Sequence, residues 1–212
     1  MIGPSSSHTA GAAKIGLMAR NIFNLQPKKV KIIFYGSFAK TYKGHGTDLA
    51  VIGGLLGYHA DDQRIVDSIN TAKKVGIEVN ISTSDDEVNH PNTLKIIMEH
   101  DSNSFEIVGV SPGGGKAELV EINGFHVQAH ADSNFLLVFH NDRKGVIATV
   151  AGLLASHDIN IGNMEVDRKA KGAEALMLIQ ADQPVPKNIS KALENLPHVT
   201  SVIVFNEIIF NK

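Results

Sequence analysis

Hydrophobic residues recur at helical spacing between Ala10 and Asn24, directly after a polar loop from Gly3 to Thr9. This pattern predicts a helix that begins near His8 or Thr9. Further along, the pattern predicts a strand, a glycine-punctuated stretch that contains one short buried helix, a helix capped by Asp61 or Asp62, and a second strand. These elements are expected at 30–35, 36–57 with its helix at 47–56, 61–76, and 77–82.

A polar run then precedes three predicted strands, at 94–99, 105–110 and 116–122. The pair Asn123-Gly124 is the strongest hairpin signal in the chain, because both residues tolerate the positive φ that a tight turn needs. We therefore expect 125–128 to return antiparallel to the preceding strand. A first α+β domain, residues 1–130, ends there, and the small and polar residues up to Ser133 form the natural boundary.

From Asn134 onward the order of predicted elements is strand, helix, strand, strand, helix, strand, at 135–139, 146–156, 160–166, 174–180, 187–196 and 199–205. This βαββαβ order is ferredoxin-like and predicts a second domain, residues 134–212, with two helices on one face of a sheet. The other face carries few charges and is a candidate dimerisation surface, with an ordinary exposed sheet face as the alternative. The expected fold class is therefore α+β, in two domains.

Composition limits the chemistry that this chain can perform alone. Its 212 residues include no Cys, which excludes disulfides, thiolate nucleophiles, and any iron–sulfur or structural zinc site built from its own sulfurs. Seven Lys or Arg and no acid lie between Met1 and Thr47, although the net charge is −2. The amino-terminal segment is thus locally positive and suits a carboxylate substrate or an acidic partner, with solvated lysines as the alternative.

Composition and hydropathy also limit the possible partners and the location of the protein. No aromatic residues interleave a basic patch, so we expect no nucleic acid partner. No apolar run approaches the length that spans a bilayer, and the first residues lack a basic segment followed by an apolar one. We therefore expect a cytoplasmic protein without membrane contact.

Two motifs stand out as candidate chemistry. Gly3-Pro4-Ser5-Ser6-Ser7-His8-Thr9 places three hydroxyls, a His and a Thr ahead of a helix, whose unpaired N–H groups suit a carboxylate or a phosphate. A simple capping run is the alternative. In Lys43-Gly44-His45-Gly46-Thr47-Asp48, flanking glycines can present an imidazole to a ligand for proton transfer, with an ordinary surface His as the alternative.

Taken together, these motifs resemble the β subunit of iron–sulfur-dependent L-serine dehydratase. The resemblance rests on the two motifs above, on Tyr35-Gly36-Ser37, on His90-Pro91-Asn92-Thr93, and on the triplet from Gly113 to Gly115. It covers essentially the whole chain, since these β subunits also end in an ACT domain. Their first domain is related in fold to the allosteric substrate-binding domain of some phosphoglycerate dehydrogenases. Further residues usually precede the Gly-Pro-Ser motif in this family, so we expect that the start of this sequence is internal or trimmed.

The resemblance implies an activity and a set of site residues. The reaction converts L-serine to pyruvate and ammonia. His45 is implied as the general base, and the substrate-binding residues are Ser5, Ser6, Ser7, His8, Thr9, Thr47, His90 and Asn92. A [4Fe–4S] cluster is implied as the Lewis acid for the leaving hydroxyl. Since this chain has no Cys, the cluster is expected on a partner α subunit.

In the second domain, the segment from Phe139 to Val146 resembles the first loop of an ACT domain, where amino acids commonly bind between two copies. Asp142 and Gly145 match the pattern and are the candidate effector-binding residues. Lys144 occupies the place often taken by Pro, so the loop is expected to be less rigid. A homodimer through the ACT domain follows from the resemblance, and a purely structural dimerisation module without effector is the alternative.

Two other functions compete with the dehydratase reading. A non-catalytic serine sensor would bind serine in the first domain and relay its occupancy through the ACT domain. A gene neighbour that encodes a Cys-containing partner would favour the enzyme over this sensor. A pyridoxal-phosphate dehydratase is disfavoured, because no phosphate-cradling loop is paired with a Schiff-base Lys.

Overall fold

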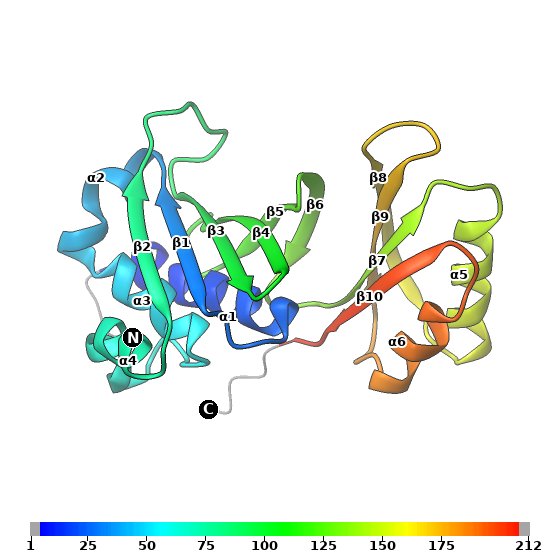
Figure 1. Ribbon diagram of the computed structural model, residues 1–212, viewed down its shortest axis with the longest axis horizontal. Helices are drawn as coiled ribbons and strands as arrows, with labels where there is room; N and C mark the ends of the chain where they lie inside the picture. The colour runs from blue at the N-terminus through cyan, green and yellow to red at the C-terminus, as the bar shows by residue number, and fades with distance from the viewer. Residues whose placement is uncertain (1–4, 208–212) are drawn as a thin grey trace. The chain divides into compact units, whose positions relative to one another are not determined.

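The structure is a computed structural model and describes residues 5–207. Its contacts divide the chain into two units, Met1–Gly124 and Phe125–Lys212 (Figure 1). Sequence patterns set the boundary later, at 131–133, because they assigned the strand after Asn123-Gly124 to the first domain. In the structure this strand, β6 (Phe125–His130), contacts β8 (Ile161–Arg168) and β9 (Glu174–Ala181) of the second unit.

The first unit combines a mixed sheet with helices. Its elements are η1, a π-helical turn (Ser7–Gly11), α1 (Ala12–Phe23), β1 (Lys29–Phe34), α2 (Gly36–His45), α3 (Thr47–Leu55), the 3-10 turn η2 (Gln63–Asp67), α4 (Ser68–Lys74), β2 (Glu78–Thr83), β3 (Thr93–His100), β4 (Asn103–Val110) and β5 (Glu118–Ile122). Within this unit the strand order is β2-β1-β3-β4-β5. Strands β1 and β2 run parallel, and the pairs β1–β3, β3–β4 and β4–β5 are antiparallel.

Helices cover one face of this sheet (Figure 1). Helix α1 contacts β3 and β4, α2 contacts β1 and β3, and α4 contacts β2. Alternation along β1 explains the two faces, because Val30 and Ile32 are buried whereas Lys29 and Lys31 are exposed. The largest fully buried side chains of the unit include Ile15, Met18, Ile22, Ile32, Phe34, Phe38, Ile52, Leu94, Ile96 and Met98.

Helix α1 also packs closely against α3. A Cβ atom at Gly16 would overlap the carbonyl oxygen of Val51, so only glycine allows this approach. Because α1 continues η1 and α3 begins at Thr47, this packing fixes the two segments relative to each other.

Most predicted elements are confirmed, but α2 was missed. The stretch before Thr47 was expected to lack a helix, whereas Gly36–His45 is helical. Only Phe38 is buried in this helix, so it has no apolar repeat for a pattern to detect. The helix predicted at 61–76 is divided into η2 and α4, and Asp62 caps η2 as expected, since its side chain accepts from Arg64 N.

The second unit has the predicted βαββαβ order after β6. Its elements are β7 (Asn134–Asn141), α5 (Val146–Ser156), β8 (Ile161–Arg168), β9 (Glu174–Ala181), α6 (Lys187–Glu194) and β10 (Val199–Phe205). The strand order β10-β7-β9-β8, with antiparallel neighbours, confirms the ferredoxin-like fold. Its helix-side core gathers Leu136, Val138, Val146, Val150, Leu154, Met177, Ile179, Ile189, Leu193 and Val202.

The other face of this sheet was expected to be a dimerisation surface or an ordinary exposed face, and the structure shows that β6 covers part of it. Strand β6 lies against β8 and β9: His126 N donates to Asp167 Oδ2 at 2.8 Å, and Gln180 Nε2 donates to Gln128 O at 3.1 Å. Phe125 meets the ring of Phe139 at 6.2 Å. The chain thus covers part of the candidate dimerisation face with its own strand, and homodimerisation stays a prediction.

Within residues 5–207, no helix has both the length and the apolar character that a membrane crossing requires.

Candidate active site

The hydroxyl-rich loop forms the first turn of the helical segment, close to the predicted start. Gly3 and Pro4 lie outside the described residues. Gly11 N donates to Ser6 O at 3.0 Å, which gives η1 its π-helical form. The turn directs His8 into the protein, and only 9% of this residue is exposed. The hydroxyls of Ser5 and Ser7 lie 3.1 and 3.3 Å from His8 Nδ1 and hydrogen-bond to it.

His8 connects η1 to helix α2. Its Nε2 lies 3.3 Å from Ser37 Oγ, and its ring meets Phe38 edge-on at 5.0 Å. The ring centroids of His8 and His45 are 4.6 Å apart, with the planes at 90°. Burial, and secondly the neighbouring His45, lower the pKa of His8 below its ordinary value of 6.5. His8 is therefore a neutral imidazole at neutral pH, with one nitrogen that donates and one that accepts.

His45 is the last residue of α2, which corrects the expectation of an open glycine turn. Gly46 follows with φ 63°, and its N–H donates to Lys43 O at 3.4 Å. A left-handed glycine at this position is a common helix ending. The turn of the chain at Gly46 then starts α3 at Thr47, so His45 and Thr47 flank one glycine.

Three buried polar side-chain atoms in this region have no hydrogen-bond partner in the described part of the chain: Thr9 Oγ1, His45 Nδ1 and Thr47 Oγ1. They belong to η1, α2 and α3, which contact one another. An unpaired buried polar atom costs about 1–3 kcal/mol. Such a group is typical of a site where a ligand or a second chain supplies the missing partner.

Asp48, next to Thr47, closes the second motif and has a carboxyl with a shifted pKa. Its side chain accepts from Leu49 N at 2.9 Å, and burial raises the pKa of its carboxyl above the usual 3.8.

The turn at His90 and Asn92 is tied to the same cluster. Pro91 O accepts from Ser37 N at 2.7 Å. Asn92 N donates to His90 Nδ1 at 3.1 Å, and Asn92 Nδ2 donates to Ser111 O at 3.1 Å. The side chains of His90 and Asn92 thus hold turns together, and substrate contact by either stays a prediction.

The glycine-rich loop after Ser111 packs against η1. Ser111 Oγ donates to Lys116 O at 3.1 Å, and a Cβ atom at Gly11 would overlap Ser111 Oγ. The structure therefore gathers all the motifs quoted from the first domain around η1 and α2. Reasoning from the sequence gave Ser37 and Phe38 no role, and only the folded chain shows that they hold His8.

Residues 1–115 match the family described as serine dehydratase beta chain. A probable L-serine dehydratase beta chain of Bacillus subtilis is 48% identical over 202 residues, which are 95% of this chain and 92% of that protein. The L-serine dehydratase beta chain of Peptoniphilus asaccharolyticus is 34% identical over 203 residues, 95% of this chain and 91% of that one.

The chain belongs to the serine dehydratase beta-chain family. Residues 135–198 match the ACT domain, which confirms the second predicted domain type. A D-3-phosphoglycerate dehydrogenase of Bacillus subtilis is 30% identical over 194 residues, 90% of this chain and 36% of that protein. This match agrees with the expected relation of the beta chain to phosphoglycerate dehydrogenases.

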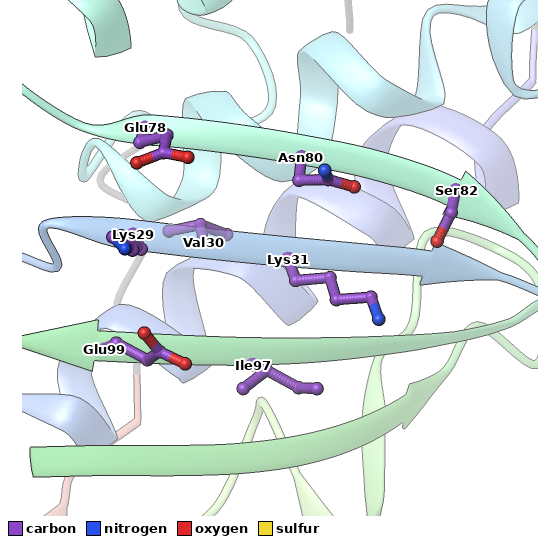
Figure 2. A pocket seen from close by; sticks show the side chains of 8 residues that line it. All are labelled: Lys29, Val30, Lys31, Glu78, Asn80, Ser82, Ile97 and Glu99. Carbon is purple, nitrogen blue, oxygen red and sulfur yellow. The ribbon is translucent and has the colours of Figure 1, made fainter.

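A hollow of about 560 Å³ lies on the face of the first sheet that helices do not cover. Figure 2 shows its lining on three neighbouring strands: Glu78, Asn80 and Ser82 from β2, Lys29, Val30 and Lys31 from β1, and Ile97 and Glu99 from β3. None of the predicted site residues lines it. Its lysines and glutamates alternate as on an ordinary solvated sheet face.

In the ACT domain, the two predicted effector residues lie in the loop between β7 and α5. Gly145, at φ 89°, directly precedes α5. Asp142 Oδ2 accepts from Gly172 N and from Arg168 Nη1, both at 2.9 Å, and these contacts hold the pKa of its carboxyl below the usual 3.8. Effector binding by Asp142 and Gly145 stays a prediction.

The beta chain alone does not fit a [4Fe–4S] cluster. It has no Cys, and within residues 5–207 no three His, Asp or Glu side chains gather as metal ligands.

Proposed function

We propose that this beta chain supplies substrate-binding residues and the general base of an L-serine dehydratase, in a site completed by an α subunit. The names of the two beta-chain relatives support the reaction, L-serine to pyruvate and ammonia. The observation that carries the proposal is the group of unpartnered buried atoms on Thr9, His45 and Thr47 beside the His8–His45 pair. A bound amino acid, with its carboxylate, ammonium and hydroxyl, offers the partners that this group lacks.

In this proposal His45 removes the Cα proton of serine. A base that becomes an imidazolium is destabilised by a like charge close to it. Its neighbour His8, 4.6 Å away, is kept neutral by its lowered pKa, so it does not oppose this protonation. His8 itself is held on both sides, by Ser5 and Ser7 at Nδ1 and by Ser37 at Nε2, which fixes the ring that faces His45.

The hydroxyls of Ser5, Ser6, Ser7, Thr9 and Thr47 are proposed to bind the carboxylate and ammonium of serine. Hydroxyls both donate and accept, so they can serve either group. His90 and Asn92 complete the site through the turns that they hold. The [4Fe–4S] cluster implied by the family resemblance is assigned to the α subunit, because the beta chain contains no Cys.

Reconstitution of the two-chain enzyme tests this function. The full-length beta chain is mixed without oxygen with a Cys-bearing α subunit of an L-serine dehydratase, and pyruvate formed from L-serine is measured. We expect turnover only when both chains are present, with D-serine and each chain alone as controls. Absence of turnover while the α subunit shows the visible absorbance of an intact cluster would contradict the proposal.

A serine sensor is the second candidate function, favoured by the ACT domain and by the match to a phosphoglycerate dehydrogenase. A sensor would bind serine without converting it. Calorimetry with L-serine on the beta chain alone, beside the pyruvate assay, separates the two functions, since binding without turnover in the complete mixture supports the sensor.

A further inference from the structure

The ACT domain contains a hollow of about 670 Å³ where three of its turns meet. We call it the basic hollow and define it by Asp142, Arg143, Lys144, Arg168, Lys171 and His198. The first three residues lie between β7 and α5, Arg168 and Lys171 lie at the turn from β8 to β9, and His198 directly precedes β10. Three separate segments thus form a concave wall rather than one flat surface.

The basic hollow is positively charged, whereas the domain as a whole has slightly more acids than bases. From Phe125 to Lys212 the chain has eight Lys or Arg and nine Asp or Glu. Four of these eight cations line the hollow, together with a single acid. The rest of the domain is therefore acidic, and an anion would be attracted to this one place.

The single acid of the basic hollow is already engaged. Asp142 accepts from Arg168 and from Gly172 N, as described above. Arg143 is anchored in turn, because its Nη1 donates to Gly172 O at 3.1 Å and to Asp142 O at 3.3 Å. The negative charge of Asp142 is thus partly offset by Arg168, which leaves the hollow positive on balance.

The two lysines of the hollow, unlike Asp142 and Arg143, have side chains that are not engaged in hydrogen bonds in the described part of the chain. Lys144 and Lys171 are exposed, and neither makes an ion pair or a side-chain hydrogen bond within residues 5–207. Two free ammonium groups and two guanidinium groups therefore face one space. Guanidinium forks and lysine ammonium groups are the side chains that bind phosphate best.

We propose that the basic hollow binds a small molecule that carries more than one phosphate group. Its volume lies in the range of small-molecule sites. A nucleic acid is a poorer match, since it would need cations along a stripe, whereas the four cations of the hollow come from two turns that line one concave space. The proposal concerns the ACT domain alone and does not depend on the serine chemistry of the first domain.

Calorimetry with inorganic tripolyphosphate on the full-length chain tests this proposal without the α subunit. We expect one tripolyphosphate per chain, with an affinity that falls as salt is added. The double variant Lys144→Gln and Lys171→Gln should weaken binding by about tenfold for each lysine removed, as expected for charge-assisted hydrogen bonds. Because these lysines support no other described contact, the variant should keep the circular dichroism of the unaltered chain.

The matched control is Lys187→Gln with Lys191→Gln. These lysines are exposed on α6 in the same domain and do not line the hollow, so the control removes equal charge and should leave the affinity unchanged. Equal losses in the two double variants would overturn the proposal, since they would indicate a diffuse charge effect. Citrate that binds as tightly as tripolyphosphate, or an oligonucleotide that binds more tightly, would also overturn it. Weak binding of citrate, L-serine and the oligonucleotide would support it.

Discussion

The cluster around His8 and the basic hollow hold their polar groups in opposite ways. In the first, hydroxyls and imidazoles lie close together, His8 is neutral, and three buried atoms lack partners. In the second, charged side chains are exposed and the one carboxylate has two donors. Unpaired buried dipoles act at short range and depend on orientation, whereas exposed charges act at longer range and weaken with salt. The first arrangement fits the proposed positioning of a reactant, and the second fits the proposed attraction of an anion.

The largest effect that would sharpen this contrast is expected at His45. In the reconstituted enzyme, His45→Ala should reduce turnover of L-serine by about 100- to 10,000-fold, the usual contribution of a general base. Tripolyphosphate binding to the same variant should be unchanged, because the basic hollow lies in the other domain. Pyruvate assays and calorimetry measure the two effects.

The matched control for this variant is His59→Ala, an exposed His of the same domain. It should retain the turnover of the unaltered enzyme. Turnover of His45→Ala close to that of the control would remove His45 as the base.

The second effect compares how closely a helix packs against its neighbours inside each domain. Gly16→Ala places a methyl group on the carbonyl oxygen of Val51 and should destabilise the first domain by about 1–3 kcal/mol. The same substitution at Gly152, in α5 of the ACT domain, meets no atom within 4 Å and should stabilise its helix by about 1 kcal/mol. Urea unfolding of the two variants measures both changes.

Opposite signs in this pair would confirm that the segments bearing Thr9 and Thr47 are held by a close helix contact. Similar small changes in both would show that α1 and α3 can separate at little cost, and the first site would then be less ordered than the structure indicates.

The sequence predicted the elements better than it predicted their contacts. Strong apolar repeats, as in α1, and the ferredoxin-like order after Asn134 were sufficient, because burial of one face determines each of these elements. Helix α2 was not predicted, because it buries only Phe38 and so has no apolar repeat. A usable signal was nevertheless present: Lys43 and His45 in the last turn, followed by glycine, are typical of a helix ending.

The site residues show the same division. Motifs predicted His8, His45 and Asn92 as site residues, which stay predictions, but they did not predict the hydrogen bond between His8 and Ser37, 29 positions away in sequence. The basic hollow was missed as well, although its lysines were visible in the sequence, because its cations come from segments that only the sheet brings together. Contacts of this kind depend on tertiary packing, which local periodicity does not encode.

A smaller effect is expected at Asn92. Asn92→Ala removes the hydrogen bond from its amide to Ser111 O and should destabilise the first domain by about 1 kcal/mol. Asn89→Ala, at an exposed neighbour, is the control and should have no measurable effect. Urea unfolding measures stability, and the KM for serine in the two-chain enzyme shows whether Asn92 also contacts substrate. Unchanged stability would contradict a structural role for this amide in the first site.

The smallest effect is a pH dependence that only the buried site should show. Burial and the neighbouring His45 lower the pKa of His8 below 6.5, so the unfolded chain binds more protons at this residue than the folded chain does. The contribution of neutral His8 to stability is thus complete above pH 6.5 and is lost progressively as the pH falls from 6.5 through the lowered pKa. His8→Gln should remove this part of the pH dependence, while the exposed control His59→Gln should retain it.

Urea unfolding at a series of pH values from 7.5 to about 5 tests this, since it spans the ordinary pKa of His. Equal slopes in His8→Gln and the unaltered chain would mean that His8 is solvated when folded, and the contrast between a neutral buried site and a charged exposed one would fail.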